Sequence, residues 1–127
     1  MKGIKTLVVS DDLKQRLFAS YPPAHDKHFG DHVTLVFGIS DHDVADDEPD
    51  ADVVVVDRFV SDVADVFTVT VNGSSTRPDG KPYHLTWSMA SASGKGPRHS
   101  VDAIVQTNHN TSVGWTEKLP IGFLSFK

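Results

Sequence analysis

Apolar and polar residues alternate along several short stretches of the chain, which predicts a protein built mainly of β-strands. Alternation or β-branched composition predicts strands at 6–10, 31–38, 52–60, 66–71, 80–89 and 120–127. The dipeptide Asn72-Gly73 follows the fourth of these strands and is typical of a tight hairpin turn. Segments 73–82 and 90–99 are rich in Gly, Ser and Pro, and they predict loops.

Apolar residues recur at helical spacing in two further places. The first predicted helix is capped by Ser10, carries apolar positions at 13, 17, 18 and 21, and ends at Pro22-Pro23. A second short helix is predicted after Ser100, with Asp102 in its first turn. Together these elements predict a single α+β domain over residues 1–127, with mainly antiparallel sheet and two short helices.

Length and composition narrow the class of protein. A chain of 127 residues can bury one ordinary core. The chain has no cysteine, so disulfides and thiolate metal sites are excluded. No segment approaches the roughly 18 apolar residues of a membrane span, and the first residues do not follow a signal-peptide pattern. We therefore expect a cytoplasmic protein with no membrane partner.

Charge is spread unevenly along the chain. The formal net charge of −5 argues against broad binding to nucleic acid, so duplex DNA is not an expected partner. Segment 41–52 is strongly acidic and contains no Lys or Arg, which predicts a solvated loop. Segment 77–98 holds four cations, opposed by Asp79 alone. These cations are either ordinary surface charge or a rim that attracts an anion.

The predicted strand at 80–89 has two faces of different chemistry. One face carries aromatic and apolar residues that suit a core. The other face is lined by His84, Thr86 and Ser88. A row of small polar groups led by an imidazole is unusual on a strand whose other face is fully apolar.

A second strand repeats this arrangement. In the strand at 31–38, His32 and Thr34 share one face, while Val33 and Leu35 lie on the other. A third His-x-Thr sequence begins at His109, but its neighbours are polar and no strand is predicted there. We therefore treat the third occurrence as chance.

The paired pattern His-apolar-Thr-apolar on two separate strands resembles the two-histidine (2H) phosphoesterase superfamily. That superfamily includes RNA-ligase-like cyclic phosphodiesterases, RNA-repair phosphoesterases and compact viral enzymes that destroy cyclic nucleotide signals of immunity. The resemblance implies two lobes related by a pseudo-twofold axis, each giving one motif strand to a shared cleft. It also implies that His32, Thr34, His84 and Thr86 are catalytic and that no cofactor is needed.

The chemistry explains the choice of residues. Cleaving a phosphodiester without a metal needs a base for the attacking oxygen and an acid for the leaving oxygen, and imidazole, with a pKa of about 6.5, can be either. Threonine hydroxyls can donate to the non-bridging oxygens and stabilise their developing charge. Which histidine is the acid and which is the base stays open at this point.

Residues near the motifs are candidates for holding the substrate. Cations in the loops around the second motif can clamp a phosphate, with Arg98 the first choice, and aromatic rings can stack on a base. The candidates are Arg98, Arg77, Lys95, Tyr21, Phe29, Trp115 and Ser88. Each of them also has an ordinary alternative, on the surface or in the core.

Other interpretations compete with this one. Segment 25–32, HDKHFGDH, has the nitrogen and oxygen groups of a metal site. Its irregular spacing and Gly30 argue against one helix face, and a motif threonine has no role in a metal site, so we expect no metal. The expected substrate is a nucleotide phosphodiester next to a ribose hydroxyl, either a cyclic (oligo)nucleotide signal or an RNA 2′,3′-cyclic phosphate end. The alternative is a non-catalytic nucleotide- or RNA-binding module with the same cleft.

Overall fold

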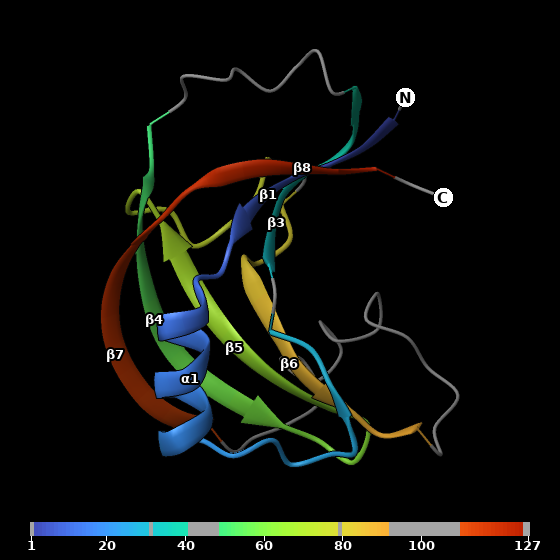
Figure 1. Ribbon diagram of the computed structural model, residues 1–127, viewed down its shortest axis with the longest axis vertical. Coiled ribbons are helices and arrows are strands. Elements are labelled where there is room, and N and C mark those ends of the chain that lie inside the picture. Colours follow the sequence, from blue (N-terminus) through green and yellow to red (C-terminus); the bar gives the residue numbers. More distant parts are fainter. Residues whose placement is uncertain (1, 31, 41–48, 79, 92–109, 126–127) are drawn as a thin grey trace.

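One helix and eight strands occupy the part of the chain that the structure describes. This computed structural model describes residues 2–30, 32–40, 49–78, 80–91 and 110–125. The elements, shown in Figure 1, are β1 (Lys2–Val8), α1 (Asp11–Ser20), β2 (Lys27–His28), β3 (His32–Ser40), β4 (Ala51–Val60), β5 (Ala64–Val71), β6 (His84–Met89), β7 (Asn110–Leu119) and β8 (Ile121–Ser125). All strand pairs are antiparallel, which confirms the α+β class with mainly antiparallel sheet.

The strands form one strongly curved sheet. Their order is β7-β4-β5-β6-β3-β1-β8, and β2 pairs with β6 outside this path. The two end strands, β7 and β8, are separated along the chain by Pro120 alone, and the Pro120 carbonyl accepts a hydrogen bond of 2.9 Å from the Val8 amide. Figure 1 shows β7 sweeping along one side of the sheet and continuing into β8 across its top. The chain itself therefore joins the two ends of the sheet.

Helix α1 packs on the core side of this curve. Its start was predicted correctly, because the Ser10 hydroxyl accepts a hydrogen bond of 3.2 Å from the Leu13 amide. Leu13 and Leu17 are buried in the main core, whereas Phe18 is exposed. The other members of this core include Leu7, Val33, Val53, Val55, Phe67, Leu85, Trp87 and Leu119. Burying each such side chain contributes about 1.5–3 kcal/mol, and this contribution holds the helix against the sheet.

The first motif strand carries a one-residue irregularity immediately after its threonine. Thr34 lies opposite Thr6 of β1, but Val36 lies opposite Lys5. Leu35 is therefore an extra residue of the kind found in a β-bulge.

The second motif strand carries the same irregularity at the same place. Thr86 lies opposite Val66 of β5, but Ser88 lies opposite Asp65, so Trp87 is the extra residue. Such an extra residue increases the local twist and changes the face on which later side chains lie. This explains why Ser88 does not follow the alternation that the sequence predicted.

Some elements differ from the sequence prediction. Neither β7 nor the short strand β2 was predicted from the sequence pattern. The predicted turn at Asn72-Gly73 is confirmed by hydrogen bonds in both directions between Val71 and Ser74. The second predicted helix, after Ser100, lies outside the described residues. No helix in the described ranges has the length and apolar composition needed to cross a membrane.

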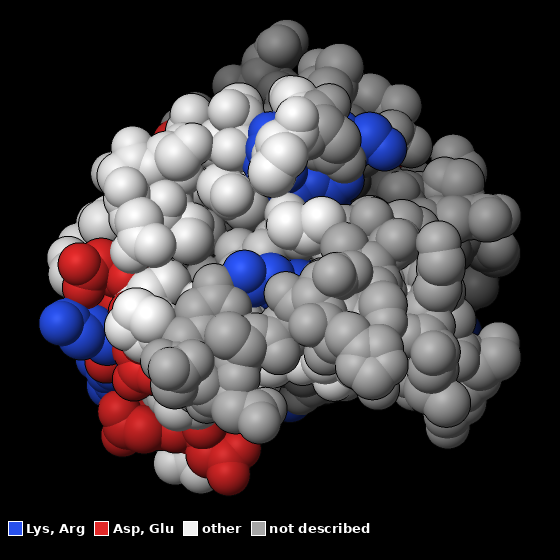
Figure 2. Space-filling model, turned by 90° about the horizontal axis from the view of Figure 1, so that it is seen from above, with Lys and Arg blue, Asp and Glu red and all other residues white. Residues whose placement is uncertain are grey.

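Charge is unevenly distributed over the face seen in Figure 2. Lys and Arg side chains line a hollow near the middle of the view, whereas Asp and Glu gather at one edge, where further Lys or Arg side chains lie among them. Most of the acidic segment at 41–52 lies outside the described residues, but Asp50 and Asp52 are exposed, as expected of a solvated segment.

Candidate functional site

The two motif strands are neighbours in the centre of the sheet. β3 and β6 pair antiparallel, with Val33 opposite Leu85. Residues next to such a pair also lie across from each other, which sets His32 across from Thr86 and Thr34 across from His84. Because Val33 and Leu85 point into the core, these four polar residues lie on the opposite face of the sheet. By this register, each motif histidine is at the position across from the threonine of the other motif.

The His84 ring is held in a defined tautomer. Its Nδ1 lies 3.0 Å from the carbonyl oxygen of Pro82. A carbonyl can only accept a hydrogen bond, so Nδ1 carries the proton and Nε2 of the neutral ring presents its lone pair. The backbone just before β6 thus leaves Nε2 as the basic atom of His84.

The surroundings of His84 favour its neutral form. Burial of the ring is the main cause that lowers the pKa of His84, and the hydrogen bond to Pro82 opposes this effect. The charges of Arg77, His32 and Lys81 lower the pKa further. The two imidazoles are thus close enough for protonation of one to disfavour protonation of the other.

Three of the predicted substrate-binding residues lie away from this face. Ser88 is fully buried, and its hydroxyl donates a hydrogen bond of 3.0 Å to Asp65. The Tyr21 ring packs against the main core, with its centroid 5.8 Å from that of Phe67 and 5.9 Å from that of Trp115. Trp115 also packs on the core side. Ser88 therefore lies in the interior, and the partly buried rings of Tyr21 and Trp115 have their neighbours on the core side of the sheet.

Phe29 remains beside the motif face. It packs against a small second cluster of Ala64, Val66 and Met89. Val66 lies directly opposite Thr86, so this cluster lies on the same side of the sheet as the motif residues. Phe29 is half-buried there, and its amide donates a hydrogen bond of 2.8 Å to the Trp87 carbonyl.

The predicted cations divide into two groups. Arg77 and Lys81 act on His84, so they lie close to the second motif. Arg98 and Lys95 lie outside the described residues.

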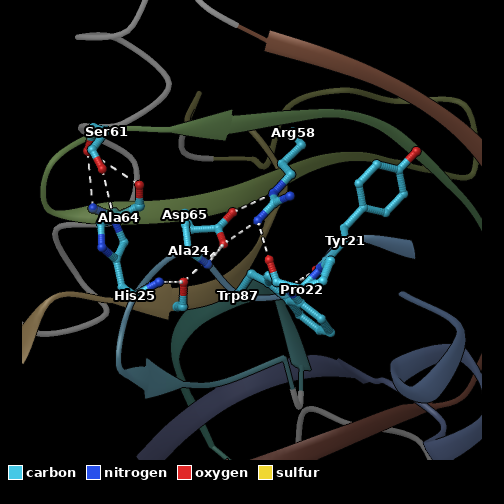
Figure 3. A network of polar contacts seen from close by, with 10 residues as sticks. Tyr21, Pro22, Ala24, His25, Arg58, Ser61, Ala64, Asp65 and Trp87 are labelled. Atoms are coloured by element: carbon cyan, nitrogen blue, oxygen red, sulfur yellow. Dashed lines mark hydrogen bonds and ion pairs between the residues drawn. The ribbon is translucent and has the colours of Figure 1, made fainter. Parts of the chain in front are cut away.

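A buried ion pair that the sequence pattern did not predict lies on the core side of the motif strands (Figure 3). The Asp65 carboxylate is fully buried and accepts hydrogen bonds of 2.8 Å from both Nε and Nη2 of Arg58. It also accepts bonds from the Ala24 amide at 2.9 Å and from the Ser88 hydroxyl at 3.0 Å. Arg58 in turn donates to the Pro22 carbonyl at 2.8 Å. The network ties the segment that leads to β3 onto β4, β5 and β6.

A signal for this network was present in the sequence. Arg58 and Asp65 are charged residues at positions within two strongly apolar strands, on either side of a short turn. Opposite charges at such positions predict an ion pair across the hairpin, because a charge is rarely buried without a partner.

The alternative metal cluster at 25–32 is dispersed. The Nε2 atom of His25 donates to the Ser61 carbonyl at 2.8 Å, and Asp26 accepts bonds from the amide and hydroxyl of Ser91. The His28 ring packs edge-on against Phe18. Within the described ranges, no three His, Asp or Glu side chains are grouped so that they could hold a metal ion.

Comparison of the chain with models of protein families, with curated proteins and with solved structures found no significant match.

Proposed function

We propose that this protein is a metal-independent phosphodiesterase of the two-histidine type. Its substrate is a nucleotide phosphodiester next to a ribose hydroxyl, in a cyclic (oligo)nucleotide signal or an RNA 2′,3′-cyclic phosphate end. The observation that carries the proposal is the antiparallel pairing of β3 and β6 about Val33 and Leu85. That pairing brings two His-x-Thr motifs from distant parts of the chain to one face.

The geometry supports a division of roles between the histidines. Nε2 of the neutral His84 takes a proton from the attacking oxygen, which is a water when the substrate is a 2′,3′-cyclic phosphate. That oxygen bonds to phosphorus, the bond from phosphorus to one ribose oxygen breaks, and protonated His32 gives its proton to the leaving oxygen. Proton exchange with solvent restores both rings. A base that is neutral near pH 7 suits the lowered pKa of His84.

The threonines and the matched irregularities add support. Thr34 and Thr86 are half-buried beside the histidines, where their hydroxyls can donate to the non-bridging phosphate oxygens. An extra residue directly after each of these threonines gives both motif strands the same local geometry. This correspondence supports a pseudo-twofold relation between two lobes that meet at a shared cleft.

The test is turnover of a panel of cyclic dinucleotides, 2′,3′-cyclic nucleotides and RNA ends in excess EDTA, with products separated by chromatography. We expect turnover with a bell-shaped dependence on pH. His32→Ala and His84→Ala should each reduce kcat by at least about 100-fold, since each removes an acid or base. His28→Ala is the matched control, because His28 is exposed on β2 and packs against Phe18 on α1.

Other outcomes would contradict the proposal. Loss of activity in EDTA with recovery on adding zinc or manganese would show a metal enzyme. Nucleotide binding without turnover would show a binding module. Circular dichroism and thermal unfolding of each variant separate lost chemistry from lost folding.

A further inference from the structure

A tight hairpin next to the second motif brings two cations together. The Arg77 amide donates to the Lys81 carbonyl at 2.8 Å, and the Gly80 amide donates to the Arg77 carbonyl at 2.9 Å. Gly80, which precedes Lys81, has a φ of +86°, a conformation that glycine adopts without the steric cost of a side chain. Residues opposite each other across a hairpin project their side chains to the same side. Arg77 and Lys81 are therefore a pair of neighbouring cations on one surface of this hairpin.

The hairpin is fixed to the candidate site. Thr76 pairs with Pro82 at its base, and the carbonyl of Pro82 accepts the hydrogen bond from the His84 ring. The Tyr83 amide donates to the Ser75 carbonyl at 3.0 Å, which joins the hairpin to the start of β6. These contacts thus fix the backbone of Arg77 and Lys81 relative to the strand that carries His84.

The positive charges of Arg77 and Lys81 affect the protonation of His84. Both Arg77 and Lys81 lower the pKa of His84, and Arg77 does so more strongly than His32 does. The histidines and threonines already supply the groups that one reacting phosphate needs. Two further cations beside His84 would therefore be suited to bind a second anionic group of the substrate.

We propose that Arg77 and Lys81 bind a second phosphate of the substrate. The inference rests on the proposed function and narrows its substrate class to nucleotides with a phosphate besides the one that is cleaved. Cyclic dinucleotides and RNA chains that end in a 2′,3′-cyclic phosphate belong to this class, because the terminal nucleotide of such a chain also carries a phosphate on its 5′ oxygen, whereas an unphosphorylated nucleoside 2′,3′-cyclic phosphate does not. Arginine suits the bidentate contact to phosphate oxygens, and lysine adds a mobile point charge.

The experiment compares two probes that differ by one phosphate, adenosine 2′,3′-cyclic phosphate and the same molecule with a 5′-phosphate. In the wild-type protein, kcat/KM for the phosphorylated probe should be higher by about 10- to 100-fold, as expected for one or two charge-assisted hydrogen bonds. In the double variant Arg77→Gln/Lys81→Gln this preference should fall below about threefold. The ratio is the decisive quantity, because any change in the basicity of His84 affects both probes equally.

The matched control is Lys118→Gln, which removes an exposed cation on β7 whose amine lies 3.7 Å from Asp52. It should keep the wild-type preference. Equal kcat/KM for the two probes in the wild-type protein would overturn the inference while leaving the proposed function intact, and so would a preference that persists in the double variant.

Equilibrium binding separates the inference from the proposed function. If neither probe is turned over, the proposed function fails, but calorimetric Kd values still test the hairpin. Tighter binding of the phosphorylated probe to the wild-type protein, lost in the double variant, supports the inference. Equal affinity for both probes refutes it.

Discussion

A methyl group added at Gly30, two residues before His32, should strongly lower the free energy of unfolding. Its φ is +96°, a conformation that costs a residue with a side chain about 1–2 kcal/mol. A Cβ there would lie 2.6 Å from Cζ3 and 2.7 Å from Cε3 of Trp87. Trp87 is almost fully buried, and its Nε1 donates to the Tyr21 carbonyl at 2.9 Å, so the ring has little room to move. Overpacking of this kind costs a further ~1–3 kcal/mol.

Gly30→Ala should therefore lower the free energy of unfolding by about 2–5 kcal/mol, a large part of the 5–15 kcal/mol typical of a domain. Urea unfolding monitored by tryptophan fluorescence measures this loss. Gly73→Ala is the matched control, since Gly73 has a similar φ of +86° and nothing within 4 Å of an added Cβ. Its cost should be only the backbone cost of about 1–2 kcal/mol. Equal losses in the two variants would refute the argument that Trp87 blocks the position.

Further predictions concern charge and pH. Asp65→Asn should lower the free energy of unfolding in urea by about 3–5 kcal/mol, because it leaves Arg58 without its buried carboxylate. Glu117→Gln, which removes a more exposed ion pair, should lower it by at most about 1 kcal/mol. Similar losses in the two variants would contradict a structural role for the buried Arg58–Asp65 pair. Arg77→Gln removes a charge that lowers the pKa of His84, so the acid limb of the kcat/KM profile should move to higher pH, and an unchanged limb would contradict the proximity of the two groups. The pKa of His84 is lower in the folded protein than its ordinary value of 6.5, so the folded state becomes less stable as the pH falls below 6.5 and the unfolded chain binds the proton more readily. His84→Asn removes this titration, so the free energy of unfolding should decline less steeply between pH 7 and 5.

Local signals in the sequence predicted local structure well. Ser10, followed by acidic residues and helical spacing, defined the start of α1, and Asn72-Gly73 defined a turn. These features depend on neighbours within a few residues, so the chemistry of the segment is sufficient. The period of two in the motif strands likewise predicted their buried faces, with Val33 and Leu85 almost fully buried.

The parts that failed depend on distant partners. The start of β7 is polar, and its period of two becomes clear only at Val113, Trp115 and Leu119. Trp115 lies opposite Val55 of the core, a pairing that no local pattern encodes. Ser88 left the predicted face because the register of β6 against β5 shifts at Trp87, and that shift depends on the partner strand. The sequence pattern therefore predicted candidate residues for substrate contact, but the register of the paired strands determines which face of the sheet each side chain occupies.

The pairing between β3 and β6 has a mechanical consequence. Within the described ranges, β3 is joined to β6 by one pair, Val33 with Leu85, and β2 also pairs with β6, whereas β4 pairs with β5 and β7 over most of its length. We therefore expect the curved sheet to open most easily between β3 and β6, where both histidines lie. A ligand that contacts both β3 and β6 should hold the two strands together. Amide hydrogen exchange in these strands should then be slower when the ligand binds more tightly.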